Sequence, residues 1–225
     1  MKKLGLGELL EDLMPDVHPK IPWARLAEVL IVSRFCEPSS ELHIAEQFYQ
    51  ASALADLLGV PDEEIYANRL YRALDHLLEH KDRVQQYLKE RLGQLFAINY
   101  DILLYDVTST YFEGEEANNP QAQRGYSRDS RPDCKQVCIG MVVTKEGIPL
   151  GYEVFEGNRH DSKTVEIIIE KMEALYGKSD RVWIMDRGMA SEENLELLAE
   201  ERRRYIIGTP KNQLKKCEKQ LLAKG

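Results

Sequence analysis

The sequence predicts an α/β protein in α+β order, with a helical N-terminal region followed by a mixed β-sheet core. Apolar residues recur at helical spacing from about residue 22 to residue 97. Beyond residue 98 they gather in short runs separated by turn residues, which is typical of strands. The chain has 225 residues, 43% of them hydrophobic, which is enough for one good-sized core or two small ones. We therefore predict a helical domain over residues 1–97 and a sheet-based domain over residues 98–225.

The helical region should consist of several short helices. The apolar sets that predict them include Leu70, Leu74, Leu77 and Leu78. Prolines mark helix starts or breaks, because proline lacks the backbone donor that an interior turn needs. They lie at Pro19, Pro22, Pro38 and Pro61.

The second half predicts three strands, a helix, a strand, a helix and a final strand. Lys145-Glu146-Gly147 offers a hairpin turn between the second and third strands, which would make them antiparallel. Asp161-Ser162 is a candidate N-cap for a helix that ends near Gly177, and Ser191 is a candidate N-cap for the next helix. The apolar runs that predict the strands lie at residues 102–105, 137–143, 149–155, 182–185 and 205–208.

The charge balance excludes a protein whose whole surface attracts nucleic acid. The net charge is −8, whereas phosphate binding needs local positive potential. Any DNA site would therefore be a local basic patch, and a solvated face is the simpler alternative for each candidate. The candidate patches are Arg124, Arg128, Arg131 and Lys135, and the basic run over residues 202–219.

Composition also bears on the compartment. No apolar stretch approaches the roughly 20 residues that a membrane helix needs, so we expect no membrane partner. Acidic residues close behind Lys2 and Lys3 exclude the apolar segment of a signal peptide. The four cysteines show no Cys-x-x-Cys pair, which favours reduced thiols in the cytoplasm over a zinc site or disulfides.

Two predicted buried strands are each followed by an aspartate. Asp106 follows the run 102–105, and Asp186 follows the run 182–185. Carboxylates at strand ends are held by a rigid backbone, and magnesium prefers oxygen ligands. Two ions held by such carboxylates could activate a nucleophile and stabilise the leaving oxygen of a phosphodiester. Aspartate is also common in turns, so the spacing leaves a structural role open.

Ordered blocks around these aspartates resemble the DDE transposases of bacterial insertion sequences. Residues 104–114 (LYDVTSTYFEG) resemble the first catalytic block, and residues 185–191 (MDRGMAS) resemble the second. Residues 124–136, which include RGYSRD and RPD, resemble the approach to the second strand, and residues 157–164 (GNRHDSKT) resemble the turn into the first core helix. The helical segments 36–41 and 69–75 are also similar, so the resemblance covers nearly the whole chain.

The resemblance implies a ribonuclease-H-like core in which Asp106 and Asp186 are the first two acids of a catalytic triad that holds Mg²⁺ or Mn²⁺. It implies DNA partners, namely transposon terminal inverted repeats and target DNA, and a homodimer of the parent enzyme associated with the nucleoid. Cleavage of transposon ends and strand transfer would be the activity. The residues that we expect to contact DNA are Arg124, Tyr126, Arg128, Arg131, Lys135 and Arg187.

The third acid of the triad should be a glutamate in a Tyr-x-x-Arg-x-x-x-Glu-x-x-x-x-x-x-Lys signature. Glu218 is the nearest candidate, but Lys211, Leu214 and Gly225 occupy the signature positions around it. We therefore expect the chain to stop before the third carboxylate, which would leave the ribonuclease-H-like core incomplete.

Two other functions fit part of the pattern. A truncated and catalytically inactive product could bind DNA or the full-length transposase and inhibit it. A phosphatase of the haloacid-dehalogenase type also uses an aspartate after a strand, but Thr108 stands where a second aspartate would be needed. For single residues the simpler expectations are a turn position for His160, a core position for Trp183, and support of the loop after Asp106 by Thr108 and Ser109.

Overall fold

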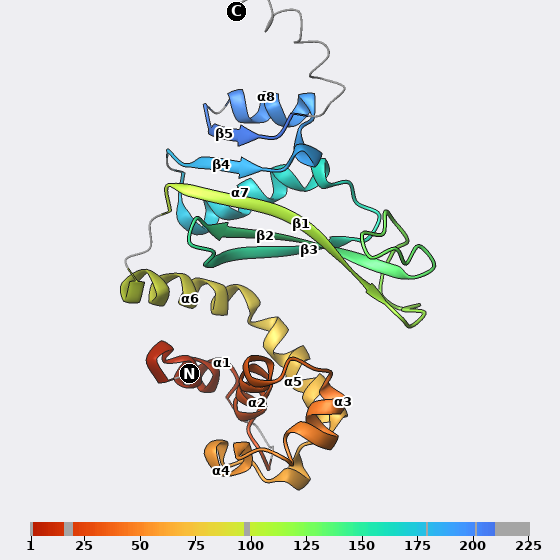
Figure 1. Ribbon diagram of the computed structural model, residues 1–225. Helices are drawn as coiled ribbons and strands as arrows, with labels where there is room; N and C mark the ends of the chain where they lie inside the picture. Colours follow the sequence, from red (N-terminus) through yellow and green to blue (C-terminus); the bar gives the residue numbers. More distant parts are fainter. Residues whose placement is uncertain (1, 16–19, 97–99, 179, 201, 210–225) are drawn as a thin grey trace, which may run out of the picture. The chain divides into compact units, whose positions relative to one another are not determined.

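The computed structural model describes residues 2–15, 20–96, 100–178, 180–200 and 202–209. The chain divides into two compact units, residues 1–97 and residues 98–225 (Figure 1). The first unit is helical, and the second is built on a β-sheet. Within the described ranges, no helix is both long enough and apolar enough to cross a membrane.

The helical unit is organised around its second helix. Leu26, Val29 and Leu30 of this helix, α2 (Trp23–Cys36), are buried in one cluster with Leu70 and Ala73 of α5 (Ala67–Glu79). Pro22 is the N-cap residue of α2, in agreement with the expectation that prolines mark helix starts. The elements are η1 (Lys2–Leu4), α1 (Leu6–Leu13), α2 (Trp23–Cys36), α3 (Glu41–His43), the π-helical η2 (Ile44–Phe48), α4 (Leu54–Leu58), η3 (Asp62–Glu64), α5 (Ala67–Glu79) and α6 (Lys81–Phe96).

The second unit contains a five-stranded mixed sheet in the order β3-β2-β1-β4-β5. The pairs β1–β2 and β2–β3 are antiparallel, and β1–β4 and β4–β5 are parallel. This topology confirms the predicted α/β class and the mixed sheet that follows the helical N-terminal region. The elements are β1 (Ile102–Phe112), β2 (Lys135–Thr144), β3 (Pro149–Glu156), η4 (Asp161–Thr164), α7 (Val165–Tyr176), β4 (Val182–Met185), η5 (Arg187–Met189), α8 (Glu192–Glu200) and β5 (Arg204–Ile207).

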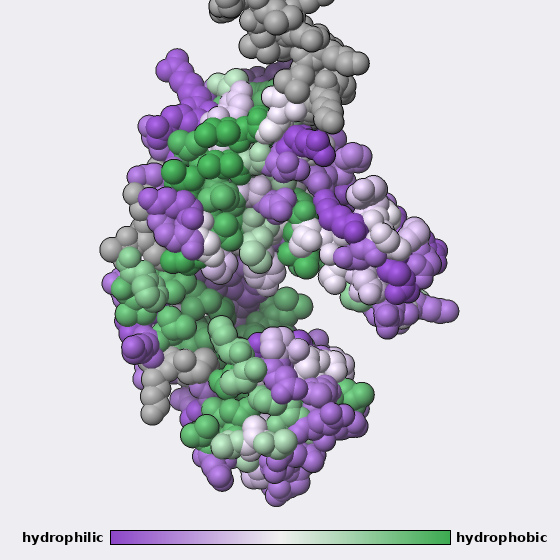
Figure 2. Space-filling model, viewed as in Figure 1, coloured by the Kyte–Doolittle hydropathy of each residue, from purple (hydrophilic) through white to green (hydrophobic). Residues whose placement is uncertain are grey.

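One face of the sheet packs against α7 and α8. Alternate residues of β1, namely Leu103, Tyr105 and Val107, are buried in one cluster with Ile168 of α7 and Leu198 of α8. Because side chains alternate along a strand, the residues between them lie on the opposite face. That face keeps apolar side chains accessible, among them Met141 at 44% and Ile206 at 62% exposure, and Figure 2 shows apolar side chains gathered over β4 and β5. The two faces of the sheet are therefore unequally covered.

Two local predictions in this unit are wrong. The first strand does not close at Asp106 but continues to Phe112, because Val107, Thr108 and Thr110 are β-branched residues that favour extended backbone. Asp161 does not cap the following helix. A 3-10 turn occupies residues 161–164, and α7 begins at Val165 without a side-chain cap. The N-cap role of Ser191 is confirmed, since its hydroxyl accepts a hydrogen bond from the Asn194 backbone N–H at 3.2 Å.

Candidate active site

Asp106 on β1 and Asp186 immediately after β4 lie at the same level of two neighbouring strands. In the parallel pairing of β1 with β4, Tyr105 is opposite Met185, and the residue that follows each of them in the chain is an aspartate. Tyr105 and Met185 are both buried in the core on the α7 side. Since alternation places the following residues on the other side, both carboxylates leave the sheet away from that core. Both aspartates are exposed.

Both aspartates line the same two depressions in the surface of the sheet unit. The first, here called the acidic cleft, has a volume of about 570 Å³. The second, of about 650 Å³, has apolar walls that include Leu104, Met141 and Ile184. The acidic cleft is lined by Asp106, Val107, Thr108, Tyr126, Arg128, Gln136, Cys138, Gly157, Asn158, Arg159, His160, Asp161 and Asp186. The two carboxylates thus border an open space that a ligand can enter.

The two carboxylates fit a divalent cation by their chemistry. Asp106 Oδ1 accepts a hydrogen bond from the Val107 backbone N–H at 2.8 Å, which orients the carboxylate and leaves its second oxygen available. Among the described residues, neither Asp106 nor Asp186 forms an ion pair with a basic side chain. Hard cations such as Mg²⁺ take oxygen ligands of this kind and keep several waters. No group of three or more acidic, histidine or cysteine side chains converges as a metal site within the described ranges.

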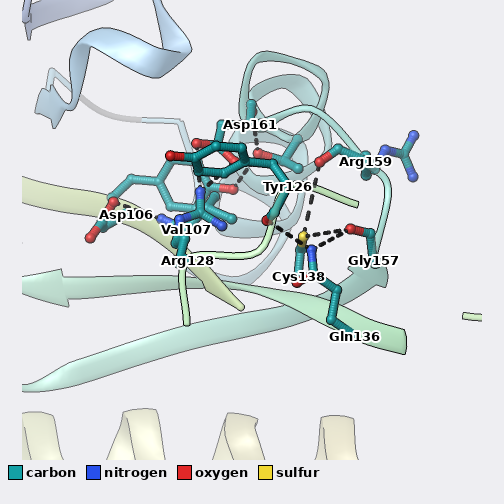
Figure 3. Close-up of polar contacts among 11 residues, drawn as sticks. Asp106, Val107, Tyr126, Arg128, Gln136, Cys138, Gly157, Arg159 and Asp161 are labelled. Carbon is teal, nitrogen blue, oxygen red and sulfur yellow. Dashed lines mark hydrogen bonds and ion pairs between the residues drawn. The ribbon is translucent and has the colours of Figure 1, made fainter. Parts of the chain in front are cut away.

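A third carboxylate in the acidic cleft is neutralised by an arginine. Arg128 Nη2 donates hydrogen bonds to both oxygens of Asp161, at 2.9 and 2.8 Å (Figure 3). Burial by itself would lower the pKa of Arg128, but the hydrogen bond and negative charge of Asp161 raise it above its ordinary value. A Cβ atom at Gly188 would lie 3.2 Å from Asp161 Oδ2 and 3.9 Å from Asp186 Oδ2. Asp161 and Asp186 therefore face the same small volume.

The loop that carries Tyr126 and Arg128 is attached firmly to β2. Gln136 is 3% exposed, and its amide nitrogen donates to the backbone oxygens of Tyr126 at 3.0 Å and Gly157 at 2.8 Å (Figure 3). Gln123 and Gln136 also exchange two backbone hydrogen bonds. A Cβ atom at Gly125 would lie 2.1 Å from the Gly157 carbonyl oxygen, so only glycine allows this close approach.

Cys138 lines the acidic cleft, and its side chain is buried. Its sulfur contacts the carbonyl oxygens of Gly157 at 3.7 Å and Arg159 at 3.9 Å (Figure 3). Burial raises the pKa of the Cys138 thiol, although the nearby positive charge of Arg128 opposes this effect. Cys138 is 2% exposed in β2, and its burial favours the neutral thiol.

The six residues expected to contact DNA are distributed over three places. Tyr126 and Arg128 line the acidic cleft. A separate depression of about 430 Å³ is lined in part by Arg124, Arg131 and Lys135. Arg187 is exposed beside Asp186 but lines none of these three depressions.

The basic groups of the separate depression already have partners. Arg131 forms an ion pair with Asp133 at 2.9 Å, and its guanidinium lies 5.0 Å from the centre of the Tyr111 ring. Arg124 Nε donates to the Asp133 carbonyl oxygen at 3.2 Å, and Lys135 Nζ donates to the Glu116 carbonyl oxygen at 3.2 Å. Arg124 and Lys135 thus keep charges that their carbonyl partners do not neutralise.

Several single-residue expectations can be compared with the structure. Trp183 is 3% exposed in the core, as predicted. His160 lies immediately before η4 and lines the acidic cleft. Thr108 lines both the acidic cleft and the apolar depression beside it, whereas Ser109 is 9% exposed on the core side. Glu218 lies outside the described residues.

The sequence does not predict the roles of two residues that line the cleft. Asp161 pairs with Arg128, and no local pattern indicates a partner 33 positions away. Gln136 anchors the Tyr126 loop. A polar side chain near the start of an apolar strand is the one signal that could have pointed to it, because buried amides need hydrogen-bond partners.

Comparison with solved structures identifies transposases whose sequence identity to this chain and TM-score are both low. The Mos1 transposase paired-end complex with left transposon end shares 13% identity, with a TM-score of 0.34, over 84% of this chain and 60% of that one. The piggyBac transposase synaptic complex with hairpin DNA shares 10% identity, with a TM-score of 0.46, over 93% of this chain and 48% of that one. The chain spans 60% of the length of the first of these proteins. No curated protein matches it.

A family comparison gives the firmer result. The model of the transposase DDE domain matches residues 98–222, which is more than half of the chain and includes every strand of the sheet, both aspartates and the whole acidic cleft. The match begins where the sheet unit begins. The chain therefore belongs to the transposase DDE domain family.

Proposed function

We propose that this chain carries the metal-binding carboxylates of a DNA transposase, and that Asp106 and Asp186 are those carboxylates. The observation that carries the proposal is their placement at equivalent positions of the parallel strands β1 and β4, on one face and beside an open cleft. Membership of the transposase DDE domain family supports the reaction class, which is phosphodiester cleavage followed by strand transfer.

The charges of the acidic cleft support a need for metal. Arg128 offsets the charge of Asp161, but Asp106 and Asp186 have no cationic partner among the described residues. Two uncompensated carboxylates repel a DNA phosphate, and a divalent cation between them and the phosphate converts this repulsion into attraction. Mg²⁺ is the proposed cation, and Mn²⁺ is the alternative. One of the similar solved structures is a Mos1 mariner paired-end complex with Mn.

Each part of the cleft has a task in this proposal. Asp106 and Asp186 would hold the metal, which would supply Lewis-acid stabilisation of the charge that develops on the phosphate oxygens. The hydrogen bond from the Val107 N–H keeps the Asp106 carboxylate oriented. In the parent reaction, a water oxygen attacks the phosphorus at a transposon end and the bond to the 3′-oxygen breaks. The freed 3′-hydroxyl then attacks the phosphorus of a phosphodiester in the target DNA, and the P–O3′ bond of the target breaks to leave a 3′-hydroxyl on the target strand.

The partners follow from this reaction. The proposed substrates are the terminal inverted repeats of a transposon and the target DNA, and the proposed place of action is the nucleoid in the cytoplasm. Arg124, Lys135 and Arg187 are proposed to contact the phosphate backbone, because arginine and lysine are the usual donors to phosphate. A homodimer is the proposed assembly of the parent enzyme.

Metal binding by the chain itself is the first test. Mn²⁺ binding should be measured by calorimetry for the unmodified chain, for Asp106→Asn and for Asp186→Asn. Each substitution keeps the shape of the side chain and removes its charge, so we expect a loss of affinity of at least tenfold. Asp129→Asn is the matched control, since it removes an exposed carboxylate of the same unit that does not line the cleft. Unchanged binding in both cleft variants would contradict the metal assignment.

Cleavage of DNA is the second test. The parent enzyme with its own transposon ends should lose Mg²⁺-dependent cleavage on either substitution, and retained cleavage would refute the assignment. An inactive product that binds DNA or full-length transposase is the competing function. It is favoured by the result that, among the described residues, no three acidic, histidine or cysteine side chains are arranged as a metal site, and that the third carboxylate of the cleft, Asp161, is paired with Arg128. Cleavage of transposon-end DNA by this chain would exclude that alternative.

A further inference from the structure

Tyr126 places a large aromatic ring at the rim of the acidic cleft and leaves it uncovered. Its side chain is 84% exposed, and it lines the cleft together with Asp106 and Asp186. In the view of Figure 3 the ring extends away from Gln136, on the side where Asp106 lies. An exposed aromatic ring beside a site of proposed DNA chemistry offers a flat apolar face to a ligand.

The backbone beneath this ring is held in place before any ligand arrives. The buried Gln136 amide donates to the Tyr126 carbonyl oxygen, and Ser127 Oγ accepts from the Arg131 N–H at 2.8 Å. Gly125 contacts the Gly157 backbone so closely that no side chain fits between them. A ring on such a fixed loop loses little conformational entropy on binding, so the contact retains most of its free energy.

We propose that Tyr126 is a stacking platform for an unpaired nucleobase next to the phosphate that reacts at Asp106 and Asp186. This proposal rests on the proposed function. Every base has a π-face, so stacking on tyrosine requires no particular sequence. Bases inside a duplex are already stacked on both faces and cannot use the ring. The cleft therefore takes DNA with a flipped or frayed nucleotide at the reacting end, a state that base-processing enzymes also reach by extruding a base.

The neighbouring side chains are consistent with this ligand. Arg128 lines the cleft beside Tyr126, and its guanidinium can meet the phosphate of a nucleotide whose base lies on the ring. The polar walls provided by Asn158 and His160 offer hydrogen-bonding groups to a base edge. A hydrogen bond from the Tyr126 hydroxyl to a phosphate is the competing mode of contact. The two modes differ because phenylalanine can stack but cannot donate.

The test uses the whole chain and two DNA probes in the presence of Ca²⁺, which occupies oxygen sites. One probe is a duplex with a 3′ overhang that carries the fluorescent base 2-aminopurine, and the other is the same sequence fully paired. Binding is followed by fluorescence anisotropy of a distant dye, and stacking by quenching of 2-aminopurine. The unmodified chain should prefer the overhang probe and quench its base.

Tyr126→Ala should weaken binding of the overhang probe by about 5- to 140-fold, the range that corresponds to loss of one stacked base. It should abolish quenching and leave the paired probe unaffected. Tyr126→Phe should keep both the preference and the quenching. Tyr71→Ala is the matched control, because Tyr71 is also exposed, at 47%, but lies on α5 of the helical unit.

Each other outcome overturns a defined part of the proposal. If Tyr126→Ala lowered the affinity for both probes equally, Tyr126 would contact the DNA backbone and stacking would be refuted. The same conclusion would follow if Tyr126→Phe lowered the affinity as much as Tyr126→Ala does. Either result would leave DNA binding by the chain intact. Binding without quenching by the unmodified chain would also refute stacking. Failure to bind either probe would contradict the proposed function itself, and the stacking platform with it.

Discussion

Arg128 and Asp161 are joined through a single guanidinium nitrogen that donates to both carboxylate oxygens, at 2.9 and 2.8 Å. The pair connects the Tyr126 loop to the turn that leads into α7. Its side chains are 30% and 28% exposed, so solvent screens the interaction considerably. The pair therefore has more influence on the charge of the acidic cleft than on the stability of the unit.

Arg128→Gln should strengthen Mn²⁺ binding by the chain. The substitution frees the Asp161 carboxylate, which faces the same volume as Asp186, and so adds a third negative ligand. Stability should fall by only about 0 to 1 kcal/mol, as for a partly exposed ion pair. Calorimetric titration measures the affinity. Arg128→Gln combined with Asp161→Asn should restore the original affinity, and an unchanged affinity in the single variant would contradict the idea.

Gly125→Ala should destabilise the sheet unit by about 1 to 3 kcal/mol, because the new Cβ would lie 2.1 Å from the Gly157 carbonyl oxygen. Gly114→Ala is the control. Its Cβ would meet only Glu116 Oε1, at 3.5 Å, so its effect should stay within about 0.5 kcal/mol. Trp183 fluorescence during urea unfolding, in a Trp23→Phe background, reports the sheet unit alone. Equal effects of the two substitutions would argue against the close approach.

Thr164→Val should cost about 1 to 3 kcal/mol of stability, since it removes the acceptor of a buried hydroxyl. Tyr105 Oη donates to Thr164 Oγ1 at 2.6 Å, and Thr164 Oγ1 in turn donates to the Asp161 carbonyl oxygen at 2.6 Å. Tyr105→Phe combined with Thr164→Val should cost less than the sum of the single changes, because no unpaired hydroxyl remains. Urea unfolding of the four proteins gives the coupling, and strict additivity would show that the two hydroxyls are independent.

Alkaline pH should weaken the helical unit through Tyr49. Burial, and then the negative charge of Asp62, raise the pKa of Tyr49 to about 12. A group with a raised pKa in the folded state stabilises that state fully below its unfolded pKa of about 10, and this contribution is lost as the pH rises towards 12.

Tyr49→Phe should remove this part of the pH dependence. It also loses the hydrogen bond from Tyr49 Oη to the Val60 carbonyl oxygen at 2.8 Å, which costs about 1 kcal/mol at neutral pH. Unfolding followed by Trp23 fluorescence in a Trp183→Phe background measures both effects. An identical fall in stability between about pH 10 and 12 for both proteins would exclude Tyr49 as the source.

The sequence places a strand correctly where consecutive charged residues end its apolar run. The run Val182–Met185 coincides with β4, because Asp186 and Arg187 end the apolar pattern. The run 102–105 predicts a strand that is too short, because the charged Asp106 ends the apolar pattern whereas the β-branched residues beyond it continue β1 to Phe112. Asp161 was interpreted as a local cap because nothing within a few residues shows that Arg128 competes for its carboxylate.

The sequence alone determines three features, because they are local patterns. These are the α+β order, the two aspartates after apolar runs, and the resemblance to DDE transposases. The tertiary structure decided which of these residues act together. The register that pairs Tyr105 with Met185 sets Asp106 and Asp186 side by side on one face of the sheet. The buried Gln136 amide fixes the Tyr126 loop at the rim of the same cleft. Strand pairing and buried hydrogen bonds join segments distant in sequence, and the free energy that selects them comes from packing the whole unit.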